Sequence, residues 1–121
     1  MSPYTHHYTY TKETLMIVVI FEVELLAKKA DRYFELAKEL SKHLSKIDGF
    51  ISIERFQSLT NEGKFVSLSY WRDQKAVDQW YNKPKHAAAQ SEGRIDIFKD
   101  YRICVADVFR DYNQSTGRPN V

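Results

Sequence analysis

The clearest pattern in the chain is a stripe of apolar residues between positions 30 and 47. Apolar side chains recur there at steps of three and four, namely Ala30, Tyr33, Phe34, Ala37, Leu40, Leu44 and Ile47. Charged side chains fill the positions between them, so one face of a helix would be apolar and the other polar. Asp48 and Gly49 follow, and glycine readily takes the left-handed conformation at a helix end. The pattern predicts an amphipathic helix over residues 30–47.

Four other segments have the β-branched and aromatic composition that is typical of strands. Residues 16–23 are apolar at nearly every position, which predicts a strand that is covered on both faces. Residues 50–59 and 65–71 flank a polar turn around Gly63 and predict a hairpin. Residues 101–112 predict the last strand of the sheet.

Two short helices are expected between the third strand and the last. Asp73 is a good N-cap for a helix that runs to about Tyr81. Pro84 suits the first turn of a second helix, which runs to about Glu92 and ends at Gly93. The order of elements is therefore β-α-β-β-α-β with the second helix broken in two. This predicts a ferredoxin-like α+β protomer, in which helices cover one face of an antiparallel sheet.

The other face of this sheet carries too many apolar residues to be exposed to water, so we expect a second copy of the chain to cover it. The resulting assembly would be a homodimer. One domain is expected over residues 16–112. Residues 1–15 would form an N-terminal arm or edge strand before it, and residues 113–121 a polar tail after it.

Composition excludes several classes of partner. The formal net charge of +2, with no basic run, is too small to favour nucleic-acid binding. No apolar stretch approaches the roughly 18 residues that span a bilayer, and the start of the chain lacks the pattern of a secretory signal. A single cysteine, Cys104, fits a reducing compartment, so we expect a cytoplasmic protein. The four histidines lack ligand spacing, so no metal site is expected.

Candidate chemistry is concentrated between the third and the last strand. Aromatic residues make up 14% of the chain, which is high enough to suggest an aromatic-lined cavity. The residues expected to bind substrate in that cavity are Tyr70, Trp71, Trp80 and Arg94, with Glu22 as a further candidate from the first strand. His86 is the candidate catalytic base, because an unperturbed imidazole titrates near neutral pH.

Each of these residues also has a structural interpretation. His86 can be a hydrogen-bonded histidine at a helix end, and both tryptophans can simply fill the core. Arg94 can pair with a neighbouring acid, and Glu22 can be an ordinary charge that points outward. If Glu22 points inward instead, loss of solvent would raise its pKa and make it a candidate base.

The spacing of the aromatic and polar residues resembles that of the antibiotic biosynthesis monooxygenase family of dimeric α+β barrel proteins. The match covers roughly residues 16–112, and the residues that carry it are Asp48-Gly49-Phe50, Tyr70-Trp71-Arg72-Asp73, Trp80, His86, Ala89-Gln90, Gly93-Arg94, Tyr101, Val105-Ala106 and Arg110-Asp111-Tyr112. The resemblance implies a homodimer whose two sheets close into a barrel, with a pocket between helices and sheet in each protomer. Some relatives oxidise aromatic or polyketide substrates with O₂ and no cofactor, and others cleave haem.

The chain departs from both catalytic patterns of the family. Trp80 matches the tryptophan of haem-cleaving relatives, but Glu22 stands where they have asparagine and Gln90 where they have histidine. Trp71 matches the tryptophan of quinone-forming relatives, but Ser67 stands where they have asparagine. A lone histidine can still serve as a proximal haem ligand, so haem binding stays open.

The sequence therefore favours a cofactor-independent monooxygenase that acts on a small aromatic or electron-rich molecule. His86 would be the base, Trp71, Trp80 and Tyr70 would form the pocket wall, and Arg94 would orient the substrate. The alternative is a dimeric small-molecule-binding or stress-response module without turnover, and a haem-degrading enzyme is the third possibility. An open cavity that reaches His86 would favour the enzyme, whereas a site filled by its own aromatic side chains would favour the binding module.

Overall fold

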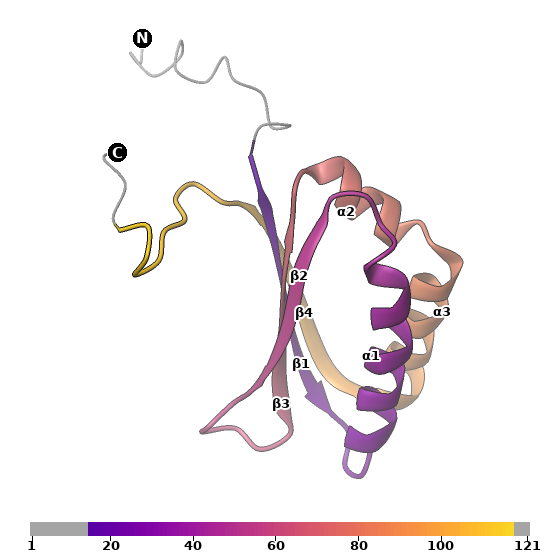
Figure 1. Cartoon of the computed structure of the whole chain (residues 1–121). Coiled ribbons are helices and arrows are strands. Elements are labelled where there is room, and N and C mark those ends of the chain that lie inside the picture. The colour runs from indigo at the N-terminus through magenta and orange to yellow at the C-terminus, as the bar shows by residue number, and fades with distance from the viewer. Residues whose placement is uncertain (1–14, 118–121) are drawn as a thin grey trace, which may run out of the picture.

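A computed structural model describes residues 15–117, which form one antiparallel sheet with every helix on the same side (Figure 1). Residues 1–14 of the expected N-terminal arm and the last four residues of the expected tail lie outside the described residues. The elements are β1 (Ile17–Leu25), α1 (Ala30–Leu44), β2 (Phe50–Gln57), β3 (Lys64–Trp71), α2 (Gln74–Tyr81), α3 (Pro84–Glu92), η4 (Gly93–Ile97) and β4 (Phe98–Asp107). The predicted ferredoxin-like α+β order is confirmed.

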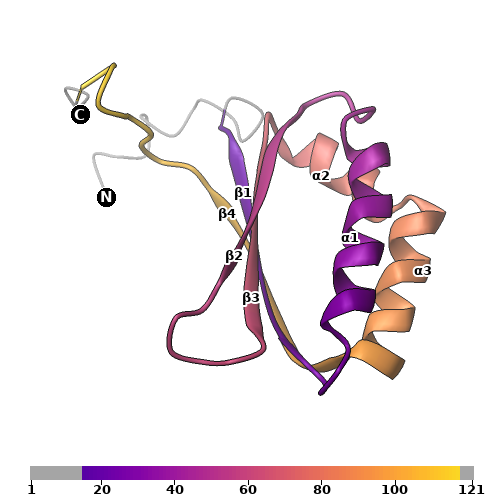
Figure 2. The ribbon, with the colours of Figure 1, turned by 60° about the horizontal axis from the view of Figure 1, so that its bottom comes forward.

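The strands lie in the order β2-β3-β1-β4, so the first strand is central rather than at an edge. Val19 pairs with Ser69 of β3 and with Val105 of β4, and Ile20 pairs with Leu68 and Cys104. Because side chains alternate along a strand, this register puts Val19 on the helix-covered face and Ile20 on the opposite face. No helix among residues 15–117 covers that opposite face, as a second view shows (Figure 2).

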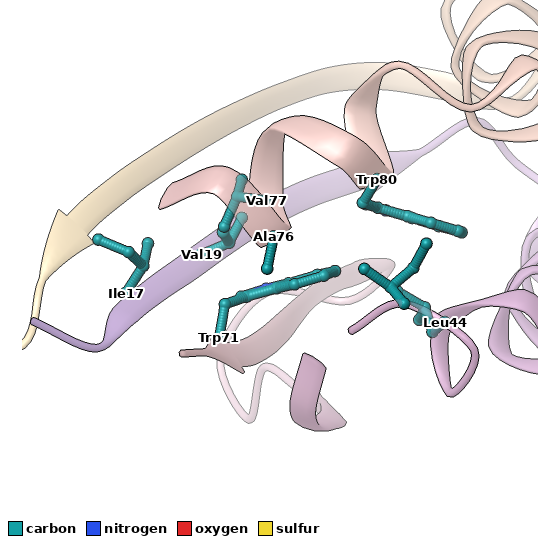
Figure 3. Packing of buried hydrophobic residues seen from close by; sticks show 8 residues of the cluster. Ile17, Val19, Leu44, Trp71, Ala76, Val77 and Trp80 are labelled. Atoms are coloured by element: carbon teal, nitrogen blue, oxygen red, sulfur yellow. The ribbon is translucent and has the colours of Figure 1, made fainter. Parts of the chain in front are cut away.

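One of the two core clusters lies between the sheet and α2, where Trp71 and Trp80 are 2% and 6% exposed (Figure 3). The Trp71 ring lies beneath α2 next to Ala76, and the Trp80 ring extends from α2 toward Leu44. Asp73 caps α2 as predicted, because its Oδ1 accepts a hydrogen bond from the Ala76 backbone N–H at 2.9 Å. The cap fixes where α2 starts, and so fixes Trp80 over the sheet.

Two glycines lie where other segments of the chain approach the backbone closely. Gly49 has φ +95°, the left-handed conformation expected after the first helix, although α1 itself already ends at Leu44. A Cβ on Gly49 would also lie 2.7 Å from the Cβ of Ala76 in α2. The Cβ of any other residue at position 93 would clash with the Phe98 ring. Gly49 is thus required by its backbone conformation, whereas a larger residue at position 93 would require the Phe98 ring to move.

The structure confirms one predicted boundary and corrects another. α3 ends at Glu92 with Gly93 as its C-cap, as predicted, and the backbone then continues as the π-helical turn η4 before β4 begins at Phe98. The last strand ends at Asp107 rather than near position 112, since Asp107 already pairs with Ile17, the first residue of β1. Among residues 15–117, no partner strand continues the ladder beyond that point.

An ion pair fixes α3 against α1. The Arg32 guanidinium donates from Nε and Nη2 to the two carboxylate oxygens of Glu92, at 2.6 and 2.7 Å. This two-pronged geometry is the strongest form of an arginine–carboxylate contact. It holds the C-terminal end of α3 in place, and α3 carries His86.

No helix in the described part of the chain is long and apolar enough to cross a membrane.

Candidate functional site

A cavity of about 120 Å³ lies between the sheet and the three helices. All four strands and all three α-helices contribute to its wall, which is mostly apolar and aromatic. Its polar side chains are few and come from both layers: Arg55, Ser67 and Ser69 from the sheet, and His86 and Gln90 from α3. An apolar pocket with a few converging polar groups is the usual form of a small-molecule site.

His86 reaches the cavity from the first turn of α3, two residues after Pro84. Its ring packs edge-on against Trp80 and Tyr81, with ring centroids 4.9 Å apart in both pairs. Nδ1 and Nε2 are both shielded from solvent, and neither has a hydrogen-bond partner among the described residues. His86 is therefore not the hydrogen-bonded surface histidine of the structural interpretation.

Burial lowers the pKa of His86 from 6.5 to about 4, because the charged imidazolium would lose its hydration inside the aromatic surroundings. This differs from the titration near neutrality that the sequence suggested. The imidazole is consequently neutral at pH 7, with one ring nitrogen free to accept a proton. An anion that forms beside it would raise its pKa again, since an opposite charge favours the imidazolium.

We expect His86 to make the protein less stable in mild acid. Between pH 6.5 and 4 the unfolded chain binds a proton at this residue and the folded chain does not, so the free energy of unfolding falls as the pH falls. The contribution of His86 above pH 6.5 is on the order of 2 kcal/mol after allowance for its partial exposure. Urea unfolding of the wild type and of His86→Gln at pH 7.0 and 4.5 measures it.

The difference between the two proteins isolates His86, since all other titrating groups are common to both. His43→Gln, which changes a partly exposed histidine of α1, is the matched control and should leave the pH dependence unaltered. Parallel pH profiles for the wild type and His86→Gln would contradict the lowered pKa.

Trp71 and Trp80 belong to the core and to the cavity wall at once. The indole Nε1–H of Trp71 donates a buried hydrogen bond to Ser69 Oγ at 2.9 Å, which fixes the ring and leaves no indole donor for a ligand. Ser67, at the position where quinone-forming relatives have asparagine, is also a buried cavity residue. The position that carries asparagine in those relatives is thus occupied here by a smaller polar side chain in the cavity wall.

Three predicted site residues lie away from this cavity. Tyr70 follows Ser69 on β3, so its side chain projects to the opposite face of the sheet. Glu22 projects to that face too, where it pairs with Lys64 and with Arg102, both at 3.5 Å. Arg94 is exposed in η4. The expected roles of Tyr70 in the pocket wall and of Arg94 in orientation have no geometric support, because neither side chain reaches the cavity.

Arg55 is the site residue that the sequence analysis missed. It lies on β2 and pairs with Ser67, which places it on the helix-covered face. Its Nε is shielded from solvent and has no hydrogen-bond partner among the described residues. The alternation along residues 50–57 was the available signal, since Ile53 and Arg55 are two residues apart and share a face.

The described residues contain no grouped set of metal ligands. No three His, Cys, Asp or Glu side chains within residues 15–117 are grouped so as to hold a metal ion. The space beside His86 is small, because a cavity of roughly 150 Å³ holds one benzene ring and this one is about 120 Å³.

Comparison with known proteins gives one family. The model of the antibiotic biosynthesis monooxygenase family matches residues 16–92. A jasmonate monooxygenase from Pyricularia oryzae is 40% identical over 93 residues, which are 77% of this chain and 43% of that protein. The chain thus spans less than half the length of this relative. The uncharacterized protein YqjZ from Bacillus subtilis is 27% identical over 100 residues, with 83% of this chain and 85% of that protein covered.

Solved structures show the same fold. A candidate antibiotic biosynthesis monooxygenase from Caulobacter crescentus superposes with a TM-score of 0.73 at 18% identity, over 87% of this chain and 99% of that one. A protein from Shewanella oneidensis gives a TM-score of 0.72 at 13% identity, over 78% and 92% of the two chains. At these identities the similarity establishes only the arrangement of the helices and strands. The reaction has to be inferred from the residues of the site.

Proposed function

The chain belongs to the antibiotic biosynthesis monooxygenase family, and on that premise we propose that it is a cofactor-independent monooxygenase for a small, electron-rich organic molecule. The observation that carries the proposal is His86, a neutral imidazole in the wall of an apolar cavity, with both nitrogens unpartnered within residues 15–117. A buried, unpartnered base beside empty space is suited to take a proton from a bound molecule.

The reaction needs an acidic C–H bond in the substrate, such as a methylene next to a carbonyl or an aromatic ring. His86 accepts the proton, and the carbanion that remains gives one electron to O₂. The resulting radical and superoxide combine to a peroxide, which loses water and leaves a carbonyl. The balance is CH₂ + O₂ → C=O + H₂O, so the substrate supplies all four electrons and no external reductant is needed.

The aromatic wall supports this chemistry in two ways. Trp71, Trp80 and Tyr81 exclude water, which strengthens the attraction between a substrate anion and the imidazolium of His86. Their rigid rings also offer flat apolar surfaces to a ring-shaped substrate. Because the Pyricularia oryzae relative is a jasmonate monooxygenase, jasmonate is one candidate to examine. The single cysteine supports a reducing compartment such as the cytoplasm.

The second candidate function is a small-molecule-binding module without turnover. A site filled by its own aromatic side chains would favour that function, whereas the cavity next to His86 supports the enzyme. Haem degradation has the least support, because Glu22 and Gln90 stand where haem-cleaving relatives have asparagine and histidine.

The test uses 2-indanone, whose acidic methylene lies between a carbonyl and an aromatic ring. We expect the protein to convert it to indane-1,2-dione and to consume one O₂ per product, with one product oxygen derived from ¹⁸O₂. The larger, three-ring anthrone should react more slowly, since a cavity of about 120 Å³ has less room for three fused rings than for two. Binding of either compound without O₂ uptake above the buffer rate would favour the non-catalytic module instead.

A further inference from the structure

Arg55 is a cation in the wall of a largely apolar cavity. No described residue accepts a hydrogen bond from its buried Nε–H. It extends from the sheet at the level of Ser67. Its Nε–H is shielded from solvent and unpartnered within the described residues. The ion pairs of residues 15–117 are made by other side chains, so no carboxylate of the described chain neutralises this guanidinium.

Such a donor is uncommon in a folded protein. Burial removes the water that would bind the N–H, and the loss is not compensated unless another acceptor is supplied. Unsatisfied buried groups are few in native structures, and a bound ion or ligand can supply the partner that the protein itself does not. The Nε–H of Arg55 therefore has no acceptor among the described residues, and a bound ligand could supply one.

We propose that Arg55 binds a carboxylate of the substrate, so that the substrate class is a small organic acid. This inference rests on the proposed function, because it names the substrate of the same cavity. A guanidinium presents parallel N–H groups that match the two oxygens of a carboxylate, and an arginine among apolar side chains binds such a group selectively.

Tyr33 of α1 supplies a second donor at the same place. Burial raises the pKa of its hydroxyl, while Arg55 opposes the rise through its charge and through hydrogen bonding. The hydroxyl is therefore protonated at pH 7 and able to donate. A carboxylate next to Arg55 would also be within reach of the Tyr33 hydroxyl, because Tyr33 already interacts with the guanidinium.

Arg55 and His86 would then have different functions: Arg55 would bind the carboxylate, and His86 would take the proton. Arg55 belongs to the sheet, whereas His86 belongs to the helical layer above it. An acid anchored on Arg55 would extend its carbon skeleton between the layers toward His86. The volume of about 120 Å³ allows for one ring in that space.

The experiment compares benzoate with benzamide, an uncharged molecule of nearly the same shape, by titration calorimetry at pH 7. We expect the wild type to bind benzoate about 10–100-fold more tightly, the usual range for a charge-assisted hydrogen-bonded pair. Arg55→Gln should abolish this preference while its affinity for benzamide changes by less than about threefold. Arg55→Lys keeps the positive charge but lacks the two parallel N–H donors of the guanidinium, so it should retain only part of the preference for benzoate.

Lys38→Gln removes the same charge from the exposed side of α1 and is the matched control. Unfolding curves confirm that each variant is folded. Failure of the wild type to prefer benzoate, including failure to bind either molecule, would overturn the inference. So would loss of the preference in Arg94→Gln rather than in Arg55→Gln.

Binding requires no O₂, so this result is independent of turnover. A benzoate preference without oxidation of 2-indanone would refute the proposed reaction and keep Arg55 as the acid-binding residue. Oxidation of 2-indanone without a benzoate preference would refute only the role of Arg55.

Discussion

Replacing His86 with glutamine is expected to lower the turnover of 2-indanone by ~10²–10⁴-fold, the usual contribution of a general base. Glutamine keeps a polar side chain of similar size in the cavity, but it cannot take up a proton. The loss should fall on kcat, since His86 acts on the proton that leaves in the transition state. Initial rates of O₂ uptake over a range of substrate concentrations separate kcat from KM.

The pH profile gives an independent readout of the same residue. Because burial lowers the pKa of His86 to about 4, kcat/KM of the wild type should stay constant down to about pH 5 and fall below it. A histidine in water would instead cause the fall near pH 6.5. His43→Gln should keep the wild-type rate, since His43 is outside the cavity wall. Full activity in His86→Gln would eliminate the base and leave His86 a packing residue.

The second large effect is expected at the open face of the sheet, where Leu68→Asp should dissociate a homodimer. Ile20, Leu68 and Cys104 lie side by side on this face, and Val66 and Tyr70 extend it along β3. We expect this apolar sheet surface to be covered, and a second copy of the same surface would do so. Obligate interfaces of this kind bury on the order of 2,000 Å² or more.

Sedimentation equilibrium at micromolar concentration should show the wild type as a dimer without detectable monomer. A carboxylate at position 68 would be desolvated in the interface, so Leu68→Asp should be monomeric or unfolded. Leu59→Asp is the matched control, because Leu59 is fully exposed in the β2–β3 turn and should leave the dimer intact. A wild type that is folded and monomeric would contradict the dimer.

The order of the elements and most of their extents could be predicted from the sequence alone. The three- and four-residue period of α1 and the alternation of β3 are local patterns, and local patterns dictate which face of each element is apolar. Asp73 and Gly49 were recognised for the same reason, since a cap and a left-handed turn depend on one residue and its immediate neighbours. Trp71, Trp80 and His86 could be assigned to one region because they lie within 16 residues of each other.

The ends of the last strand depended on residues far away in sequence. β4 stops at Asp107, where its ladder with β1 reaches Ile17, and it begins at Phe98, which pairs with Leu25 at the other end of β1. Neither end of the strand can be predicted from the residues next to it. Both follow from packing between segments that the chain brings together only on folding.

The composition of the site likewise depended on contacts between distant segments. The sequence alone shows Arg55 only as a polar residue in a strand, and its register with Ser67 places it in the cavity. Tyr70 and Glu22, by contrast, project to the other face of the sheet. The protonation of His86 depends on Trp80 and Tyr81, whose rings replace water around the imidazole. A sequence specifies which side chains can titrate or bind, but burial sets the free energy of their charged forms, and burial exists only in the folded protein.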